Sequence, residues 1–120
     1  MKGAQFAACW LCIISIAMVP LPAGASGNVA RGRAAAVQDC SACHQVTERQ
    51  VPPAPVFDAD SREQVAAPTF RAISNKYAGK ERQLRAFVHL PRYPMREQDF
   101  LAPVFDDIVA YIRSLHRKGV

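Results

Sequence analysis

The sequence predicts an all-α fold, because its apolar residues repeat at helical spacing and no segment alternates apolar and polar residues as a strand does. The clearest repeat is an apolar stripe in a C-terminal helix that can begin at Pro103. The stripe consists of Val104, Phe105, Ile108, Ile112 and Leu115. At 120 residues the chain has room for one small domain.

Three shorter helices are expected to precede this one. The alanine-rich segment 28–40 favours a helix, and Asn28 can cap its N-terminus. Segments 70–77 and 80–90 also carry apolar residues at helical spacing. Residues 49–67 show neither a helical nor a strand period and contain three prolines, so we expect a loop there.

Residues 1–25 have the features of a secretory signal peptide. Lys2 gives a positive start, residues 6–19 form an apolar run, and Ala23-Gly24-Ala25 resembles a cleavage site of small residues. The alternative is an uncleaved membrane anchor, but this run is shorter than the roughly 17–25 residues that a spanning helix needs. We therefore expect export, cleavage after Ala25, and a domain of residues 26–120 without a transmembrane segment.

The charges of the chain exclude one class of partner. The sequence has 15 lysines and arginines against 10 acidic residues, a formal net charge of +5. These charges are interspersed, without the basic runs that mark nucleic-acid-binding tails. No nucleic acid is expected as a partner, whereas a mildly acidic protein is compatible with this charge.

The most informative residues are Cys40, Cys43 and His44, in the sequence Cys-Ser-Ala-Cys-His. This C-x-x-C-H pattern is typical of c-type haem attachment. Positions i, i+3 and i+4 of a helical turn share a face, so all three side chains can point at one planar ring. Each thiol can form a thioether with a haem vinyl group, and the imidazole can ligate the iron. The sequence therefore predicts one covalently attached haem c, which would also enlarge a small core.

Two other uses of this motif compete with haem attachment. A redox-active or structural disulfide would use Cys40 and Cys43, but it gives no reason for the histidine that follows, and no βαβ pattern of a thioredoxin-like fold is present. A zinc site needs about four ligands, usually from two close pairs. The other histidines, His89 and His116, each stand alone and far along the chain.

With this motif the chain resembles the class I c-type cytochromes over nearly all of residues 26–120. The resemblance implies a cytochrome c-like fold in which the N- and C-terminal helices cross. In that family a glycine eight residues before the first cysteine allows a close crossing against an aromatic residue, and Gly32 and Tyr111 hold these places. The aromatic residue that the family often has four residues before this cysteine is Ala36 here. Pro68 resembles the family's proline whose backbone oxygen accepts a hydrogen bond from the ligating imidazole.

The resemblance also implies that Met95 is the second axial ligand. Met95 is the single methionine of residues 26–120 and lies in the loop before the last helix, as the family's ligand does. Its alternative role is to fill a gap in the core. Arg96 follows it where many relatives have proline. His89, six residues earlier, would as a ligand give a bis-histidine haem of lower potential.

If His44 and Met95 both ligate the iron, no coordination position is open. We therefore expect an electron carrier rather than an enzyme, or the cytochrome subunit of a redox complex, in a bacterial periplasm. Its partners would be a dehydrogenase, a reductase or an oxidase, and Arg92 and Arg96 beside Met95 could steer an acidic partner. The alternative is a haem with an open or labile sixth position, acting in gas sensing or peroxidase-like chemistry.

Overall fold

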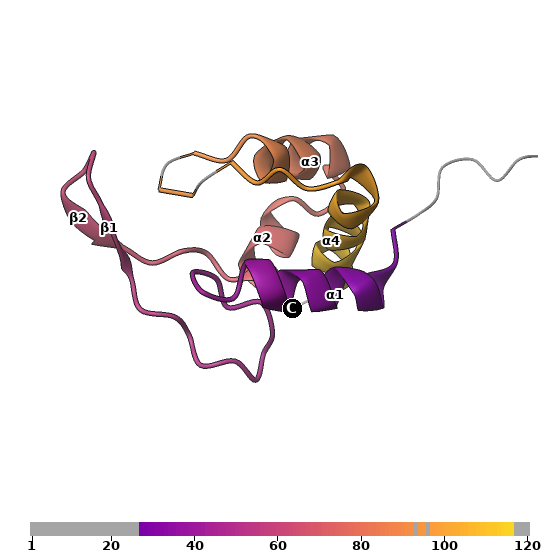
Figure 1. Cartoon of the computed structure of the whole chain (residues 1–120), viewed down its shortest axis with the longest axis horizontal. Coiled ribbons are helices and arrows are strands. Elements are labelled where there is room, and N and C mark those ends of the chain that lie inside the picture. Colours follow the sequence, from indigo (N-terminus) through magenta and orange to yellow (C-terminus); the bar gives the residue numbers. More distant parts are fainter. Residues whose placement is uncertain (1–26, 93, 96, 117–120) are drawn as a thin grey trace, which may run out of the picture.

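The computed structural model describes residues 27–92, 94–95 and 97–116, so the expected signal peptide and its cleavage site lie outside the described residues. All four expected helices are present in the described part (Figure 1). In chain order the elements are α1 (Val29–Asp39), β1 (Val56–Asp58), β2 (Glu63–Val65), α2 (Phe70–Lys76), α3 (Glu81–His89) and α4 (Ala102–Ser114). None of the described helices is long and apolar enough to span a membrane.

The helices begin where local sequence signals place them. The side chain of Asn28 accepts a hydrogen bond from the amide of Arg31 at 2.9 Å, so the expected N-cap of α1 is confirmed. Thr69 caps α2 in the same way, through the amide of Ala72 at 3.0 Å. Pro103 lies in the first turn of α4, where its missing N–H has no helical partner to lose.

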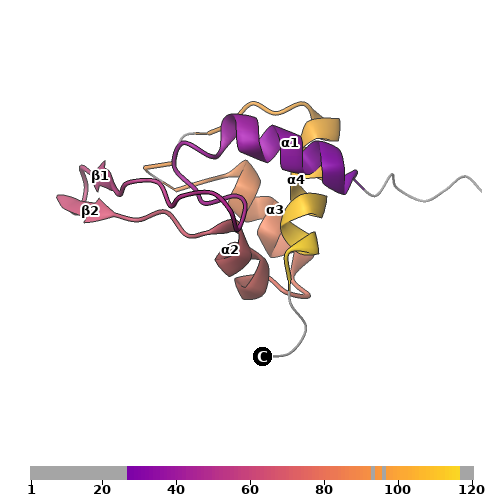
Figure 2. The same cartoon turned by 90° about the horizontal axis from the view of Figure 1, so that it is seen from below.

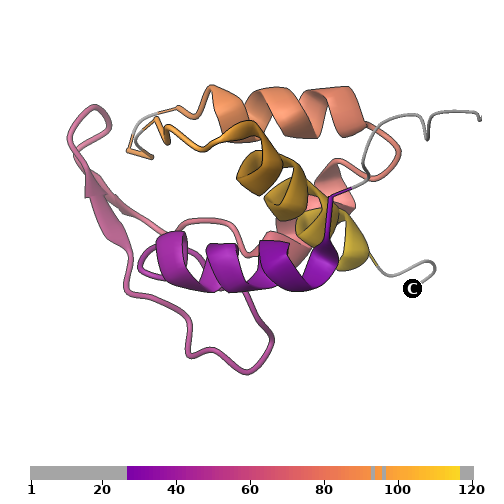
Figure 3. The ribbon, with the colours of Figure 1, turned by 45° about the vertical axis from the view of Figure 1, so that its right-hand side comes forward.

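Helices α1 and α4 cross in close contact, as the resemblance implied (Figures 1 and 3). The approach is so close that a Cβ built on Gly32 would lie 1.8 Å from the carbonyl oxygen of Asp107. Ala36, one turn further along α1, is fully buried. A small residue at this position fits the crossing, although relatives often carry an aromatic residue there.

An ion pair ties the start of α1 to α4. The buried carboxylate of Asp107 accepts hydrogen bonds from Arg31 Nε at 2.7 Å and from the backbone amide of Asn28. The hydrogen bond from Arg31 and then that from Asn28 hold the pKa of Asp107 below its ordinary value of 3.8.

The core lies between the helices and includes one residue of the loop after α1. The side chain of Val46, in that loop, is 1% exposed, and its carbonyl oxygen accepts a hydrogen bond from the hydroxyl of Tyr111 at 2.6 Å. The other buried apolar residues come from all four helices: Ala36, Phe70, Ile73, Leu84, Val88, Ile108, Val109, Tyr111 and Ile112.

The expectation of a purely helical fold is wrong in one place. Strands β1 and β2 form an antiparallel hairpin that stands away from the helices (Figures 1 and 2). The hairpin lies within residues 49–67, where we expected a loop. Each strand has three residues, which is too short for an alternating pattern to be recognised.

Polar contacts close the turn of this hairpin. The carboxylate of Asp58 accepts hydrogen bonds from the amide of Asp60 at 3.0 Å and from the hydroxyl of Ser61 at 2.8 Å. Arg62 follows with a φ of 59°, a left-handed conformation that lets the chain reverse direction. These short-range contacts, rather than apolar patterning, indicate why the segment pairs with itself.

Candidate functional site

The end of α1 delivers the two cysteines and His44 on one further helical turn. The amide of Cys40 donates to the carbonyl of Ala36 at 2.9 Å, and the amide of His44 donates to the carbonyl of Cys40 at 2.9 Å. The amide of Cys43 also donates to the carbonyl of Cys40, at 3.2 Å. This geometry places the three side chains on the same face, as their spacing predicted.

His44 is 7% exposed, and its ring is held by the backbone. Its Nδ1 lies 2.8 Å from the carbonyl oxygen of Pro68, so the hydrogen bond expected from the resemblance is present. A carbonyl oxygen only accepts hydrogen bonds, so Nδ1 is the donor of this bond and Nε2 is the ring nitrogen left to bind another partner. The ring also packs against Phe70, with 5.7 Å between the ring centroids. An oriented imidazole with a free Nε2 is suited to bind a metal ion.

A cavity of about 390 Å³ brings the predicted residues together. Cys40, Cys43 and His44 line it, and the loop that follows α3 contributes Met95. The rest of the lining is mostly apolar: Asp39, Val56, Val65, Ala66, Ala67, Pro68, Phe87, Pro94 and Gln98. Its volume lies within the roughly 300–1,000 Å³ typical of small-molecule and cofactor sites.

A comparison with protein families matches residues 29–116 to the family described as Cytochrome c. The chain belongs to the cytochrome c family. Comparisons with curated proteins and with solved structures gave no match. Cytochromes c bind haem c, and the residues that line this cavity fit that cofactor: they supply two thiols, one imidazole, one thioether and apolar walls.

The hairpin is a part of this cytochrome c site that the sequence did not reveal. Val56 and Val65 are cross-strand partners, so their side chains share one face of the hairpin, and both line the cavity. Phe57, the residue after Val56, pairs with Gln64 on the opposite face of the hairpin and is 57% exposed. The hairpin therefore adds two valines to the apolar wall of the cavity.

The thiol of Cys40 lacks the low pKa that is typical of a redox-active cysteine. Cys40 and Cys43 are not joined by a disulfide. Burial first, then the charges of Asp39 and Cys43, raise the pKa of the Cys40 thiol to about 11. Redox-active C-x-x-C cysteines have a lowered pKa instead, because the thiolate is the reactive form. The raised pKa of Cys40 thus speaks against the thiol–disulfide alternative.

His89 lies outside the cavity that holds His44 and Met95. Its ring meets Phe105 edge-on, with 5.8 Å between centroids, in a separate groove. The other residues that line this groove are Arg85, Ala86, Phe100 and Ala102. Of the two sixth-ligand candidates, Met95 is the one whose side chain shares a cavity with His44.

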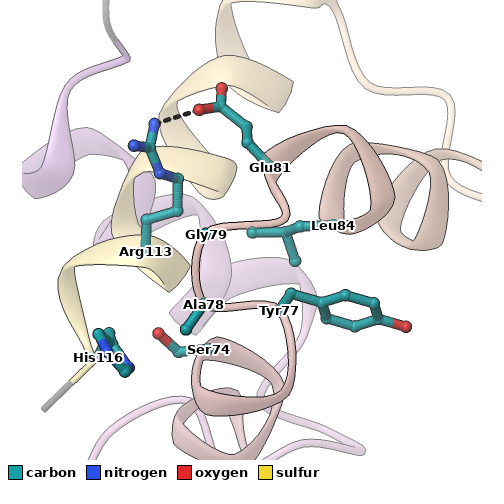
Figure 4. Close-up of a pocket in the computed structure, with 8 residues that line it drawn as sticks. All are labelled: Ser74, Tyr77, Ala78, Gly79, Glu81, Leu84, Arg113 and His116. Atoms are coloured by element: carbon teal, nitrogen blue, oxygen red, sulfur yellow. Dashed lines mark ion pairs between the residues drawn. The ribbon is translucent and has the colours of Figure 1, made fainter. Parts of the chain in front are cut away.

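His116 lies at a different hollow, between α2, α3 and α4 (Figure 4). Its Nδ1 is 3.1 Å from Asn75 Oδ1. Arg113, at the same hollow, is paired with Glu81 at 2.6 Å. Within the described residues no group of three or more histidine, cysteine or acidic side chains could hold a metal ion.

Proposed function

We propose that this chain is a single-haem electron carrier. Cys40 and Cys43 would hold the haem covalently, and His44 and Met95 would be its axial ligands. The observation that carries the proposal is the shared cavity, which gathers both thiols, the imidazole and the thioether within apolar walls. Imidazole with thioether is a common ligand pair in cytochromes c.

The bound haem supplies a one-electron iron couple, and the residues of the chain determine how that couple behaves. Pro68 orients the imidazole of His44 through Nδ1 and increases its basicity as a ligand. Val56, Val65 and Phe87 would give the bound haem apolar walls. With His44 and Met95 in both axial positions, no position is left for a substrate, so the chain would transfer electrons rather than catalyse a reaction.

The setting we propose is a bacterial periplasm. The features of residues 1–25 support export, and covalent attachment would prevent loss of the cofactor outside the cytoplasm. The electron partners would be a dehydrogenase, a reductase or an oxidase, or the chain would serve as the cytochrome subunit of such a complex.

Basic residues near the Met95 loop support docking of an acidic partner only in part. Arg92 is exposed, and Arg96 lies outside the described residues. Arg85 is bound to Glu81 at 3.1 Å and to Asp106 at 2.6 Å. Arg85 is therefore occupied within the chain, and Arg92 is the better candidate for steering a partner.

The deciding experiment is optical spectroscopy of the full chain produced with haem-attachment machinery. Ferrous and ferric spectra are recorded with and without carbon monoxide for the wild type, for Met95→Ala and for the control His89→Ala. We expect low-spin spectra that carbon monoxide does not change in the wild type and the control, and ready carbon monoxide binding by Met95→Ala.

The other outcomes would change the proposal in defined ways. If the wild type already binds carbon monoxide readily, the sixth position is open or labile, and gas sensing or peroxidase-like chemistry becomes the better-supported function. If carbon monoxide binding appears with His89→Ala and not with Met95→Ala, the ligand is His89. Colourless protein, or colour lost on extraction with acidified acetone, would refute covalent haem attachment.

A further inference from the structure

The side chain of Gln50 makes three hydrogen bonds to the backbone around His44. Its Nε2 donates to the carbonyl oxygens of Ser41 and His44, both at 2.9 Å. Its Oε1 accepts the amide N–H of Val46, also at 2.9 Å. One side-chain amide thus contacts the backbone before, at and after the histidine.

These contacts complete a turn that the helix leaves unfinished. Carbonyl groups at a helix C-terminus lack the amides of a following turn. Helix α1 ends at Asp39, and the carbonyls of Ser41 and His44 lie just beyond it. Gln50 supplies the two N–H donors that a longer helix would have supplied. A part-buried carbonyl without any partner is unfavourable, so these bonds stabilise the turn.

Gln50 is itself held by its own loop. Its backbone amide donates to the carbonyl of Thr47 at 3.3 Å, and its backbone oxygen accepts from Gln45 Nε2 at 3.0 Å. The two glutamines therefore differ in what they fix: Gln50 fixes the turn that carries His44, whereas Gln45 fixes the backbone of Gln50. A matched control must therefore come from outside this loop, and the exposed Gln64 of β2 provides one.

We propose that Gln50 is a positioning residue that sets the orientation of the His44 imidazole and, through it, the reduction potential. The hydrogen bond to Pro68 fixes one atom of the ring, Nδ1, about which the ring could still pivot. Gln50 fixes the other end of the residue, its backbone carbonyl, so the two contacts together determine where Nε2 points. This inference rests on the proposed function, because it requires that His44 is an iron ligand.

The test compares three variants in the haem-loaded full chain. Gln50→Leu removes all three side-chain hydrogen bonds, Gln50→Glu keeps the length and an acceptor for Val46 but loses both donors, and Gln64→Leu is the control. The readouts are the midpoint potential by redox titration and the low-spin ferric EPR spectrum, whose g values depend on the orientation of the axial imidazole.

We expect both Gln50 variants to change the ferrous-to-ferric ratio at the wild-type midpoint by about twofold or more and to shift the g values, with Gln64→Leu close to the wild type. Wild-type values in both Gln50 variants, or an equal shift in Gln64→Leu, would overturn the inference. If Gln50→Leu is too unstable to purify, the nearly isosteric Gln50→Glu decides by the same readouts. A wild type without haem would instead refute the proposed function, so the two failures are distinguishable.

Discussion

Gly32 of α1 and Asp107 of α4 meet backbone to backbone, with no room for a side chain between them. A Cβ on Gly32 would lie 1.8 Å from the Asp107 carbonyl oxygen and 3.0 Å from the amide nitrogen of Ile108. Helix interiors favour alanine over glycine by about 1 kcal/mol, so the glycine is unfavourable for α1 alone. The crossing of the two helices requires it.

Gly32→Ala is therefore expected to destabilise the haem-loaded protein although it raises helix propensity. Pushing α1 away from α4 costs roughly 1–3 kcal/mol in the free energy of unfolding, the usual range for overpacking. The loss in the free energy of unfolding is measured by urea denaturation, monitored by far-UV circular dichroism.

The matched control is Ala34→Gly, the reverse exchange at an exposed position of the same helix. It should lose about 1 kcal/mol from helix propensity alone. If Gly32→Ala stabilised the protein by a similar amount, the close crossing would not exist in solution.

The sequence predicted the features that depend on neighbouring residues. The four helices follow from apolar spacing and from caps such as Asn28, all of which act within one or two turns. The shared face of Cys40, Cys43 and His44 is equally local, because the three residues lie on one turn. The Gly32 contact and the Pro68 hydrogen bond were expected from the family resemblance.

The features that the sequence did not reveal arise only when segments of the chain fold back on one another. The hairpin β1–β2 is recognised only when the two short strands pair, and only then do Val56 and Val65 line the cavity. Gln50 had no motif to mark it, since its role arises from the way residues 45–50 fold back on the turn. Likewise, the sequence favoured Met95 over His89 only through the family resemblance, whereas the structure places them at different sites.

Tyr111→Phe tests the bond that joins α4 to the loop after the haem motif. The Tyr111 hydroxyl donates to the carbonyl of the fully buried Val46 at 2.6 Å, and removing it leaves that carbonyl unsatisfied. We expect a loss of about 1–2 kcal/mol in the free energy of unfolding, measured by urea denaturation of the haem-loaded protein.

Tyr77→Phe is the control for this change. The Tyr77 ring packs on Phe87 with 5.4 Å between centroids, while its hydroxyl points away from the neighbouring hollow (Figure 4). Loss of the Tyr77 hydroxyl should change the free energy of unfolding by less than about 0.5 kcal/mol, the usual range for surface changes. Equal effects of the two variants would mean that the Tyr111 bond contributes nothing specific.

The contact between Asp107 and Arg31 predicts a pH-dependent part of the stability. Hydrogen bonds from Arg31 and Asn28 lower the pKa of Asp107 in the folded protein, relative to its ordinary value of 3.8. A lowered carboxyl pKa stabilises the fold at pH values above the unfolded pKa, and this contribution is lost as the pH falls through the folded pKa. It is therefore fully present at neutral pH and disappears in the acid range below about pH 4.

The measurement is the urea midpoint of the wild type and of Asp107→Asn, from neutral pH to about pH 3. The wild type should be the more stable protein at neutral pH, and the difference should shrink as the pH falls. Asp99→Asn, which changes an exposed carboxylate, should show little difference at any pH. A constant difference between the wild type and Asp107→Asn would show that the carboxylate does not titrate with a lowered pKa.

Removal of the haem is expected to abolish the packed structure. The cavity of about 390 Å³ is walled by residues from the motif turn, the hairpin, α3 and the Met95 loop, so these segments would lose their common apolar contact. A small domain has little stability to spare, since its core is limited. We expect the chain made without haem-attachment machinery to show reduced helicity, no sharp cooperative urea transition, and binding of the dye ANS.

Met95→Ala, loaded with haem, is the control that should stay cooperatively folded, because its cavity is filled. A haem-free chain with a steep urea transition and dispersed NMR signals would show that the four helices form their core without the cofactor.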